Sequence, residues 1–511
     1  MKPFAALAAF SCILSAPVTG VQAQNEPFRP QFHFTPERNW MNDPNGLVFY
    51  EGEWHLFYQY NPYGDKWGHM SWGHAVSRDL VHWEHLPLAL AEEDGIMIFS
   101  GSAVVDWKNT SGFGRNGKPP LVAIYTGHRE GRQDQRIAFS NDRGRTWTKV
   151  PGPVLDLHMA DFRDPRVFWH DATSRWVMAV ALPNEKKVNF YTSSDLKQWK
   201  YVGEFGPAGA TGGQWECPDL FTLPVDGGGR KWVLIVNINP GGPAGGSGTQ
   251  YFTGEFDGKH FVADGGVKDI HWADYGPDFY AAVSWNDVPN SDGRRVWIGW
   301  MSNWLYGQDV PTSPWRSAMT VPRELMLRRT PDGLRLVQKP VTELKKLRLP
   351  SLLRFRGGTF TAAARWLGAY NDLPQLLDVE MNFSRVTGKD PFTVNLQTAA
   401  GERTSLTFDP AHNRLVLDRA QSGQTGFHRD FSTRHEAPLR ITNGDVAVRL
   451  LLDASSIEIL AQGGQTSVTE LIFPTPGPRG LTLTSEGATP NVTAITIHAL
   501  TAATQPSRPQ R

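Results

Sequence analysis

The chain has 511 residues, and its 51 Lys and Arg residues equal its 51 Asp and Glu residues, so its formal net charge is zero. This balance argues against nucleic acid or an anionic membrane surface as the main partner and favours a neutral substrate. The length predicts one large domain and a smaller one, and the 50 Gly and 19 Trp indicate tight turns and stacking surfaces in a mostly β chain.

Residues 1–23 have the composition of a secretory signal peptide. Lys2 precedes an apolar stretch of about 10 to 13 residues, which is short for a bilayer span, and the segment ends in VQA at residues 21–23. We therefore expect cleavage near Ala23, export to a periplasm or to the medium, and no membrane attachment of the mature form. Because Cys12 lies in this leader, the other cysteine, Cys217, would have no intramolecular disulfide partner.

A weak internal repeat runs through the Trp-rich N-terminal two thirds. A Ser-x-Asp sequence followed by Trp recurs at residues 77–83, 140–147 and 193–199, and Asp257 belongs to a looser fourth copy. Ser and Asp side chains bond their own backbone in turns, so each copy is predicted to be a hairpin turn. The repeating units between residues 28 and 335 predict a β-propeller with about five blades, and a sandwich or barrel with similar turns is the alternative. Strand-like runs precede the first three copies, at residues 54–60, 121–125 and 176–180.

The sequence changes character from about residue 350. Trp becomes rare, and runs with the alternation of half-buried antiparallel strands follow one another, at residues 376–381, 446–452 and 457–460. These runs predict a C-terminal β-sandwich over residues 350–499. Residues 500–511, rich in Thr, Gln, Pro and Arg, are predicted to be a disordered tail.

Three acidic residues lie in unusual settings: Asp43 within WMNDPNG, Asp164 within DFRDP and Glu216 within GQWECPD. Each is followed, at once or after one residue, by a proline, which fixes the local backbone and can hold a side chain in one direction. Glycosidic bond cleavage needs carboxyl groups aimed in this way, one to attack or stabilise the sugar and one to protonate the leaving oxygen.

Each of these residues also has a purely structural interpretation. An Asp before Pro is common in ordinary turns, Arg163 beside Asp164 could form a plain ion pair, and Glu216 could be a solvated residue at a strand end. Cys217 is interpreted as a buried small apolar residue and not as a nucleophile, because no nearby His forms an obvious partner.

The joint occurrence of the three motifs favours the catalytic interpretation. WMNDPNG, RDP and WECP in this order resemble the signature of glycoside hydrolase family 32, which includes invertases, inulinases and levanases. The resemblance covers nearly the whole chain after the leader. It includes residues 99–102 (FSGS), 274–280 (DYGPDFY), 322–325 (PREL) and 453–458 (DASSIE).

The resemblance implies an all-β fold, a five-bladed β-propeller followed by a β-sandwich, with the active site in the funnel at the propeller axis. It implies that Asp43 is the nucleophile, Glu216 the general acid/base, and Asp164 the residue that holds fructose hydroxyls and stabilises the transition state. A retaining mechanism requires the nucleophile and the acid to lie about 5 to 5.5 Å apart. We expect Asp164 to stay ionised through its neighbour Arg163.

The resemblance also implies a set of substrate-binding residues. Hydroxyl groups of fructose would bond to Asn42, Gln59 and Ser100. Arg163 is a further predicted substrate-binding residue. The apolar walls of the sugar site would come from Trp40, Trp67, Phe99 and Trp304. We expect no metal or other cofactor, because the histidines of the Trp-rich region lack a repeated ligand spacing; they are His69, His74, His82 and His85.

Residues 301–306 (MSNWLY) and 310–317 (VPTSPWRS) resemble exo-acting inulinases and levanases. The leading hypothesis is therefore an exported hydrolase that releases terminal fructose from inulin or levan and from sucrose. An endo-acting enzyme or a fructosyltransferase of the same family is one alternative, and a non-catalytic sugar-binding propeller is another. Retention of all three carboxyl groups argues against the binding protein. The preferred linkage and the oligomeric state stay open.

Overall fold

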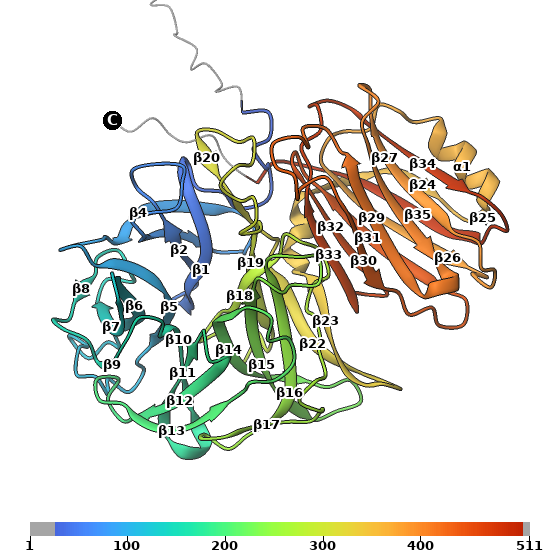
Figure 1. Cartoon of the computed structure of the whole chain (residues 1–511). Coiled ribbons are helices and arrows are strands. Elements are labelled where there is room, and N and C mark those ends of the chain that lie inside the picture. The colour runs from blue at the N-terminus through green and yellow to red at the C-terminus, as the bar shows by residue number, and fades with distance from the viewer. Residues whose placement is uncertain (1–25, 504–511) are drawn as a thin grey trace, which may run out of the picture.

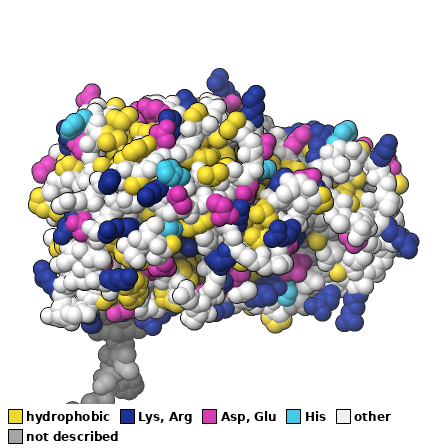
Figure 2. Space-filling model, turned by 90° about the horizontal axis from the view of Figure 1, so that it is seen from below, with side chains coloured by type: hydrophobic (Ala, Val, Ile, Leu, Met, Phe, Trp, Pro, Cys, Tyr) yellow, Lys and Arg dark blue, Asp and Glu magenta, His cyan; other side chains and the backbone are white. Residues whose placement is uncertain are grey.

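The computed structural model describes residues 26–503, and they form two domains that lie side by side (Figure 1). The predicted signal peptide, residues 1–23, lies outside the described residues, as does residue 12. Within residues 26–503 no helix has the length and apolar character needed to cross a membrane. Figure 2 shows one face of the molecule, on which acidic and basic side chains are interspersed, in keeping with the zero net charge.

Five antiparallel sheets form the larger domain, so the predicted five-bladed propeller is confirmed (Figure 1). Blade I consists of β1 (Asn39–Tyr50), β2 (Glu53–Tyr60), β3 (Ser71–Ser77) and β4 (Trp83–Leu90). Blade II consists of β5 (Met97–Val105), β6 (Leu121–Arg129), β7 (Arg132–Ser140), β8 (Thr148–Lys149) and β9 (Leu155–Met159). Blade III consists of β10 (Arg163–His170), β11 (Arg175–Leu182), β12 (Lys187–Ser193) and β13 (Lys200–Phe205), with the 3-10 turn η1 (Asp171–Thr173).

Blade IV consists of β14 (Gln214–Pro224), β15 (Arg230–Asn239), β16 (Gly248–Phe256) and β17 (Phe261–Ala263). Blade V consists of β18 (Tyr280–Ser284), β19 (Arg295–Met301), β22 (Arg323–Thr330) and β23 (Gly333–Pro340), with β21 (Ala318–Met319) paired to β19. The short strand β20 (Trp315–Arg316) crosses from blade V and pairs in parallel with the start of β1. The last propeller strand ends beyond the predicted boundary at residue 335, because β22 and β23 form one continuous hairpin.

The Ser-x-Asp repeat marks the same turn in successive blades. Each copy connects the third strand of its blade to the fourth, and the strands predicted before the first three copies are the second strands β2, β6 and β11. The Asp195 carboxylate accepts hydrogen bonds from the backbone N–H groups of Lys197 and Gln198. Asp79 binds the backbone of Val81 and His82 in the same manner, so local turn chemistry fixes the hairpins.

The innermost strand of every blade carries a bulge, with one extra residue relative to its partner strand. The register shifts lie between residues 41 and 44 in β1, 98 and 101 in β5, 163 and 166 in β10, 216 and 219 in β14, and 280 and 283 in β18. A bulge interrupts the ladder and redirects side chains. The three carboxyl residues of the sequence motifs all lie at these bulges.

The smaller domain is the predicted sandwich, with a core of aliphatic and Phe side chains between its sheets. It follows the 3-10 segment η2 (Thr342–Leu347). One sheet consists of β24 (Arg348–Phe355), β25 (Gly358–Thr359), β35 (Asn491–Leu500), β26 (Leu377–Ser384), β31 (Val446–Leu452), β32 (Ser456–Ala461) and β33 (Thr466–Leu471). The other consists of β30 (Arg434–Pro438), β29 (Arg414–Gln421), β28 (Arg403–Asp409), β27 (Phe392–Thr398) and β34 (Arg479–Ser485). The helix α1 (Phe360–Gly368) packs on β34, and η3 (Pro410–His412) connects β28 to β29.

The tail was predicted to begin at residue 500, but the chain is ordered for longer. Leu500 is the last residue of β35, and the backbone N–H of Ala503 donates a hydrogen bond to the carbonyl of Gln31. Ala503 is buried against the propeller entry segment. The remainder of the predicted tail, residues 504–511, lies outside the described residues.

A buried ionic network joins the two domains. His33, at the entry to the propeller, lies 2.8 Å from Asp453 and 2.8 Å from Glu458 of the sandwich. Glu458 also accepts a hydrogen bond of 2.7 Å from Arg323 of β22, which binds Asp274 as well. Burial alone would lower the pKa of His33, but its two carboxylate partners raise it to about 9. The sandwich therefore clamps the N-terminal segment of the propeller.

Candidate active site

A cavity of about 340 Å³ lies where the bulged inner strands of blades I to IV converge. Every predicted site residue except Trp40 lies on its wall. The lining residues are Asn42, Asp43, Gln59, Trp67, Phe99, Ser100, His128, Gln133, Asp161, Arg163, Asp164, Glu216 and Trp304.

Asp43 projects from the bulge of β1. Its Oδ2 accepts a hydrogen bond of 2.6 Å from the Ser100 hydroxyl, and its Oδ1 accepts one of 3.0 Å from the amide of Asn42. Burial raises the pKa of Asp43 above its ordinary value, while these two hydrogen bonds act in the opposite direction. Trp40 lies behind this group, fully buried, and its indole N–H donates to Oδ1 of Asn42. Trp40 thus orients Asn42 and is not itself part of the cavity wall.

Asp164 projects from the bulge of β10 with a φ of +67°, which is uncommon for a residue other than Gly but tolerated by Asp. Its backbone N–H donates to the Thr126 hydroxyl at 3.0 Å. Burial raises the pKa of Asp164 to about 7; Arg163 opposes this shift, and the carboxylates of Glu216 and Asp43 add to it. Burial therefore outweighs the guanidinium, and Arg163 does not keep Asp164 fully ionised at neutral pH.

Glu216, in β14, is the actual partner of Arg163. The guanidinium donates to its Oε1 from Nη2 at 2.9 Å and from Nε at 3.2 Å, whereas the nearest Asp164 oxygen lies 4.0 Å away. Nη1 of Arg163 also donates to Asp161 at 2.7 Å. The Tyr280 hydroxyl of blade V donates a short hydrogen bond to the other oxygen, Oε2. The Glu216 side chain is 19% exposed, compared with 6% for Asp164, so it is the more accessible to a ligand.

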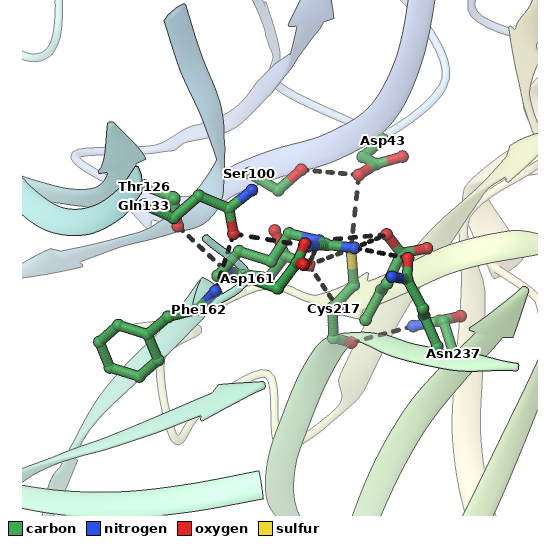
Figure 3. Close-up of polar contacts among 12 residues, drawn as sticks. Asp43, Ser100, Thr126, Gln133, Asp161, Phe162, Cys217 and Asn237 are labelled. Carbon is green, nitrogen blue, oxygen red and sulfur yellow. Dashed lines mark hydrogen bonds and ion pairs between the residues drawn. The ribbon is translucent and has the colours of Figure 1, made fainter. Parts of the chain in front are cut away.

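Cys217 contacts Asp43 and Asp164 and directly follows Glu216 in the sequence; Figure 3 shows its side chain against Asp43. Its backbone N–H donates to Oδ2 of Asp164 at 2.9 Å, and its thiol lies 3.4 Å from Oδ2 of Asp43. The residue has a φ of +44°, and its carbonyl accepts a hydrogen bond from Asn237. Burial raises the pKa of the Cys217 thiol well above its ordinary value, so the thiol stays protonated and can donate to the carboxylates.

Aromatic side chains form the outer walls. Phe99 stacks on His128 with ring centroids 4.3 Å apart. Trp304 packs against Trp40, and Trp67, 40% exposed, packs edge-on against Phe99. Aromatic walls around convergent polar groups are typical of sites that bind small molecules.

Two family models match nearly all of the described chain. Residues 33–340 match the glycosyl hydrolases family 32 N-terminal domain, and residues 361–499 match the family 32 C-terminal domain. The chain belongs to glycoside hydrolase family 32. It is thus a glycoside hydrolase, and the family resemblance identified from the sequence motifs is confirmed.

Named relatives within family 32 are similar over most of this chain. A levanase of Bacillus subtilis is 49% identical over 484 residues, which span 93% of this chain and 71% of the levanase. An extracellular exo-inulinase of Aspergillus niger is 41% identical, over 93% of this chain and 95% of the relative. The crystal structure of the exo-inulinase from Aspergillus awamori superposes with a TM-score of 0.87 at 39% identity, covering 94% of this chain and 99% of that one.

Several residues of this family 32 site were not identified from the sequence. His128 and Gln133 face each other beside the turn of the β6–β7 hairpin, Tyr280 comes from blade V, and Cys217 was interpreted as a packing residue. Asp161 was noted only as part of the DFRDP motif. Among residues 26–503, no group of three or more His, Cys, Asp and Glu side chains is arranged to hold a metal ion.

Proposed function

We propose that this protein is an exported retaining β-fructosidase that releases terminal fructose from inulin or levan and also cleaves sucrose. The observation that carries the proposal is the convergence of Asp43, Asp164 and Glu216 around Cys217 on the wall of one cavity. The names of the similar levanase and exo-inulinases support the substrate class. The neutral protein surface suits an uncharged polymer.

The proposed reaction has two steps. Asp43 attacks the anomeric carbon of the terminal fructosyl unit and forms a fructosyl-enzyme ester, while Glu216 gives its proton to the departing glycosidic oxygen. Glu216, now a carboxylate, then takes a proton from water, which attacks the same carbon and releases Asp43. The hydrogen bonds from Ser100 and Asn42 favour the ionised form of Asp43 that the first step requires.

The other groups hold the sugar and the acid in place. Asp164 would accept hydrogen bonds from fructose hydroxyls, and a ligand hydroxyl would favour its ionised form. Arg163 and Tyr280 fix the two oxygens of Glu216 from separate blades. Asn42, Gln59 and Ser100 would bond hydroxyls, while Trp67, Phe99 and Trp304 would cover the sugar ring.

A timed product profile on inulin and on levan, separated by chain length, tests the proposal. Fructose alone from the first time points is expected, and the faster polymer will give the preferred linkage. A ladder of shorter fructans would indicate endo-cleavage, and longer products would indicate transfer to another sugar. The Asp43→Asn variant is the control, and fructose release by this variant at the wild-type rate would overturn the proposed role of Asp43.

Export rests on the leader-like N-terminal sequence and on the extracellular exo-inulinases among the relatives. Fractionation of expressing cells, followed by N-terminal sequencing of the mature protein, tests it. A mature chain that starts near Gln24 outside the cytoplasm is expected. A full-length chain retained in the cytoplasm would contradict export and leave the catalytic proposal unchanged.

A further inference from the structure

One loop carries Trp304 of the cavity wall and also contacts the backbone of Trp67, another wall residue. Residues 302–312, which follow β19 and are called here the Trp304 loop, contain Trp304 on one wall. Gln308 of the same loop accepts a hydrogen bond of 3.3 Å from the backbone N–H of Trp67, which lies on another wall. The Gln308 carbonyl also accepts short hydrogen bonds from Lys66 and Arg316. The position of this loop therefore sets the spacing of Trp304 and Trp67.

The Trp304 loop is anchored on the sandwich through Tyr306, which is 1% exposed. The Tyr306 hydroxyl donates to Oδ1 of Asp278 at 2.7 Å and accepts from Nη2 of Arg419 at 2.8 Å. Arg419 belongs to β29 of the sandwich, and its Nη1 donates to Oδ2 of Asp278 at 2.7 Å. These three side chains form a closed triangle, buried at the junction of the two domains.

The triangle is held in place from the sandwich side. The guanidinium of Arg419 lies 3.9 Å from the centre of the Phe431 ring and 5.3 Å from that of Tyr306. Its Nε donates to the carbonyl of Phe431, and the backbone N–H of Leu471 donates to the Asp278 carboxylate. Burial would lower the pKa of Arg419, but Tyr306 and Asp278 raise it above its ordinary value, so the guanidinium stays charged.

We infer that Arg419, a sandwich residue that does not line the cavity, is a positioning residue for substrate binding, acting through Tyr306 on the Trp304 loop. The inference rests on the proposed function in taking the cavity as the fructosyl site. Asp43, Asp164 and Glu216 lie on blades I, III and IV and make no hydrogen bond to this loop. Loss of Arg419 therefore weakens binding of the sugar and leaves the bond-breaking groups in place.

The matched control is Arg323. It is also fully buried at the domain junction, lies 4.9 Å over the Phe279 ring, and pairs with Asp274 and Glu458. Arg419 pairs with Asp278 and Arg323 pairs with Asp274, and both acidic residues lie in the segment that leads to Tyr280. Arg323 differs in having no contact with the Trp304 loop in any of its ion pairs or hydrogen bonds.

The test compares Arg419→Met, Tyr306→Phe and Arg323→Met in steady-state kinetics on sucrose and inulin. Arg419→Met is expected to raise KM about 10-fold with kcat within about 3-fold of wild type, because uniform binding is what it removes. Tyr306→Phe is expected to change KM in the same direction by a smaller factor. Arg323→Met is expected to keep the wild-type KM. Equal KM values for the two arginine variants, or a fall in kcat alone for Arg419→Met, would overturn the inference.

Amide hydrogen exchange of residues 302–312 provides a readout that does not depend on activity. Exchange in this loop is expected to rise about 10-fold or more in Arg419→Met and to stay at the wild-type rate in Arg323→Met. Unchanged exchange in Arg419→Met would overturn the inference. If Arg419→Met does not fold, Tyr306→Phe carries both measurements. A wild-type protein that releases no fructose would overturn the proposed function, while the exchange data would still decide whether Arg419 positions the loop.

Discussion

The backbone N–H of Cys217 donates a hydrogen bond to the Asp164 carboxylate across the boundary between blades III and IV. The same residue brings its thiol to Asp43 of blade I and directly follows Glu216. A main-chain group and a small buried side chain thus set the relative positions of carboxyl groups that are far apart in the sequence. The backbone conformation at residue 217 therefore contributes to the geometry of the site together with the side chain.

Substitutions of Cys217 separate these two contributions. Cys217→Ala keeps the backbone N–H and the positive φ, so we expect kcat/KM to fall by no more than about 5-fold. Cys217→Val places a β-branched side chain at a φ of +44°, a conformation that β-branched residues adopt only as outliers. We expect a lower melting temperature and at least about a 10-fold loss of kcat/KM for Cys217→Val. Similar losses for the two variants would show that the thiol, and not the backbone, matters.

Substrates with different leaving groups distinguish the role of Glu216 as the acid from that of Asp43 as the nucleophile. An acid is needed only when the departing oxygen is a poor leaving group. Glu216→Gln is expected to lose about 10³-fold or more in kcat/KM on sucrose, and much less in kcat/KM on a β-fructoside of an acidic phenol, because kcat/KM reports the first step, in which Glu216 is the acid. Asp43→Asn is expected to lose activity on both substrates, because both require the nucleophile. The measurement is kcat/KM of each variant on the two substrates. An equal loss of kcat/KM on both substrates for Glu216→Gln would contradict its role as the acid.

Arg163→Lys tests the geometry that holds Glu216. Lys cannot reproduce the fork with which Arg163 binds Glu216 and Asp161 together. We expect kcat/KM to fall about 10- to 100-fold while the thermal unfolding midpoint changes little. Arg136→Lys is the control, because Arg136 makes a similar two-pronged contact with Asp134 but does not line the cavity. A loss of the same size in the control would mean that the effect is not specific to the site.

The His33 clamp predicts how stability depends on pH. The pKa of His33 is raised to about 9 from 6.5, so its contribution is fully present below pH 6.5 and is lost as the pH rises through 9. The shift corresponds to a loss on the order of 3 kcal/mol. We expect the thermal midpoint of the wild type to fall across this window and that of His33→Gln to fall much less. His82→Gln, a change at an exposed histidine, should behave as wild type.

A steep fall in stability between pH 6.5 and 9 that persists in His33→Gln would contradict the clamp as its cause. The measurement is a series of thermal unfolding curves between pH 5 and 10. This range covers the pKa of His33 in the unfolded chain, 6.5, and in the folded protein, about 9.

The blades could be predicted because their signal is local. The Ser-x-Asp turns bond their own backbone, as at Asp195, and the strands before them alternate in hydrophobicity. The three carboxyl residues could be identified because each lies in a short motif with a neighbouring proline. Only the family resemblance predicted that they meet at one site, since residues 43, 164 and 216 come from different blades.

The partners of these carboxyl groups could not be predicted in the same way. Arg163 and Asp164 are neighbours in sequence, but the bulge of β10 and the positive φ of Asp164 redirect the side chains, and Arg163 pairs with Glu216 of the next blade. Tyr280 reaches the site because the ring of five blades closes. His128 reaches it because the β6–β7 hairpin extends to the cavity. A buried residue such as Cys217 has the same sequence signature whether it packs a core or orients a catalytic group.

The clamp at His33 also bears on the order in which the protein folds during synthesis. Each blade takes its four main strands from one continuous stretch of chain, so the blades can pair their strands as they leave the ribosome. His33 and the backbone N–H groups of residues 31–33 bind Asp453 and Glu458, far along the chain. Residues 31–33 are therefore fixed only after the sandwich residues have been made, and a nascent chain that stops before residue 453 leaves them without these buried partners.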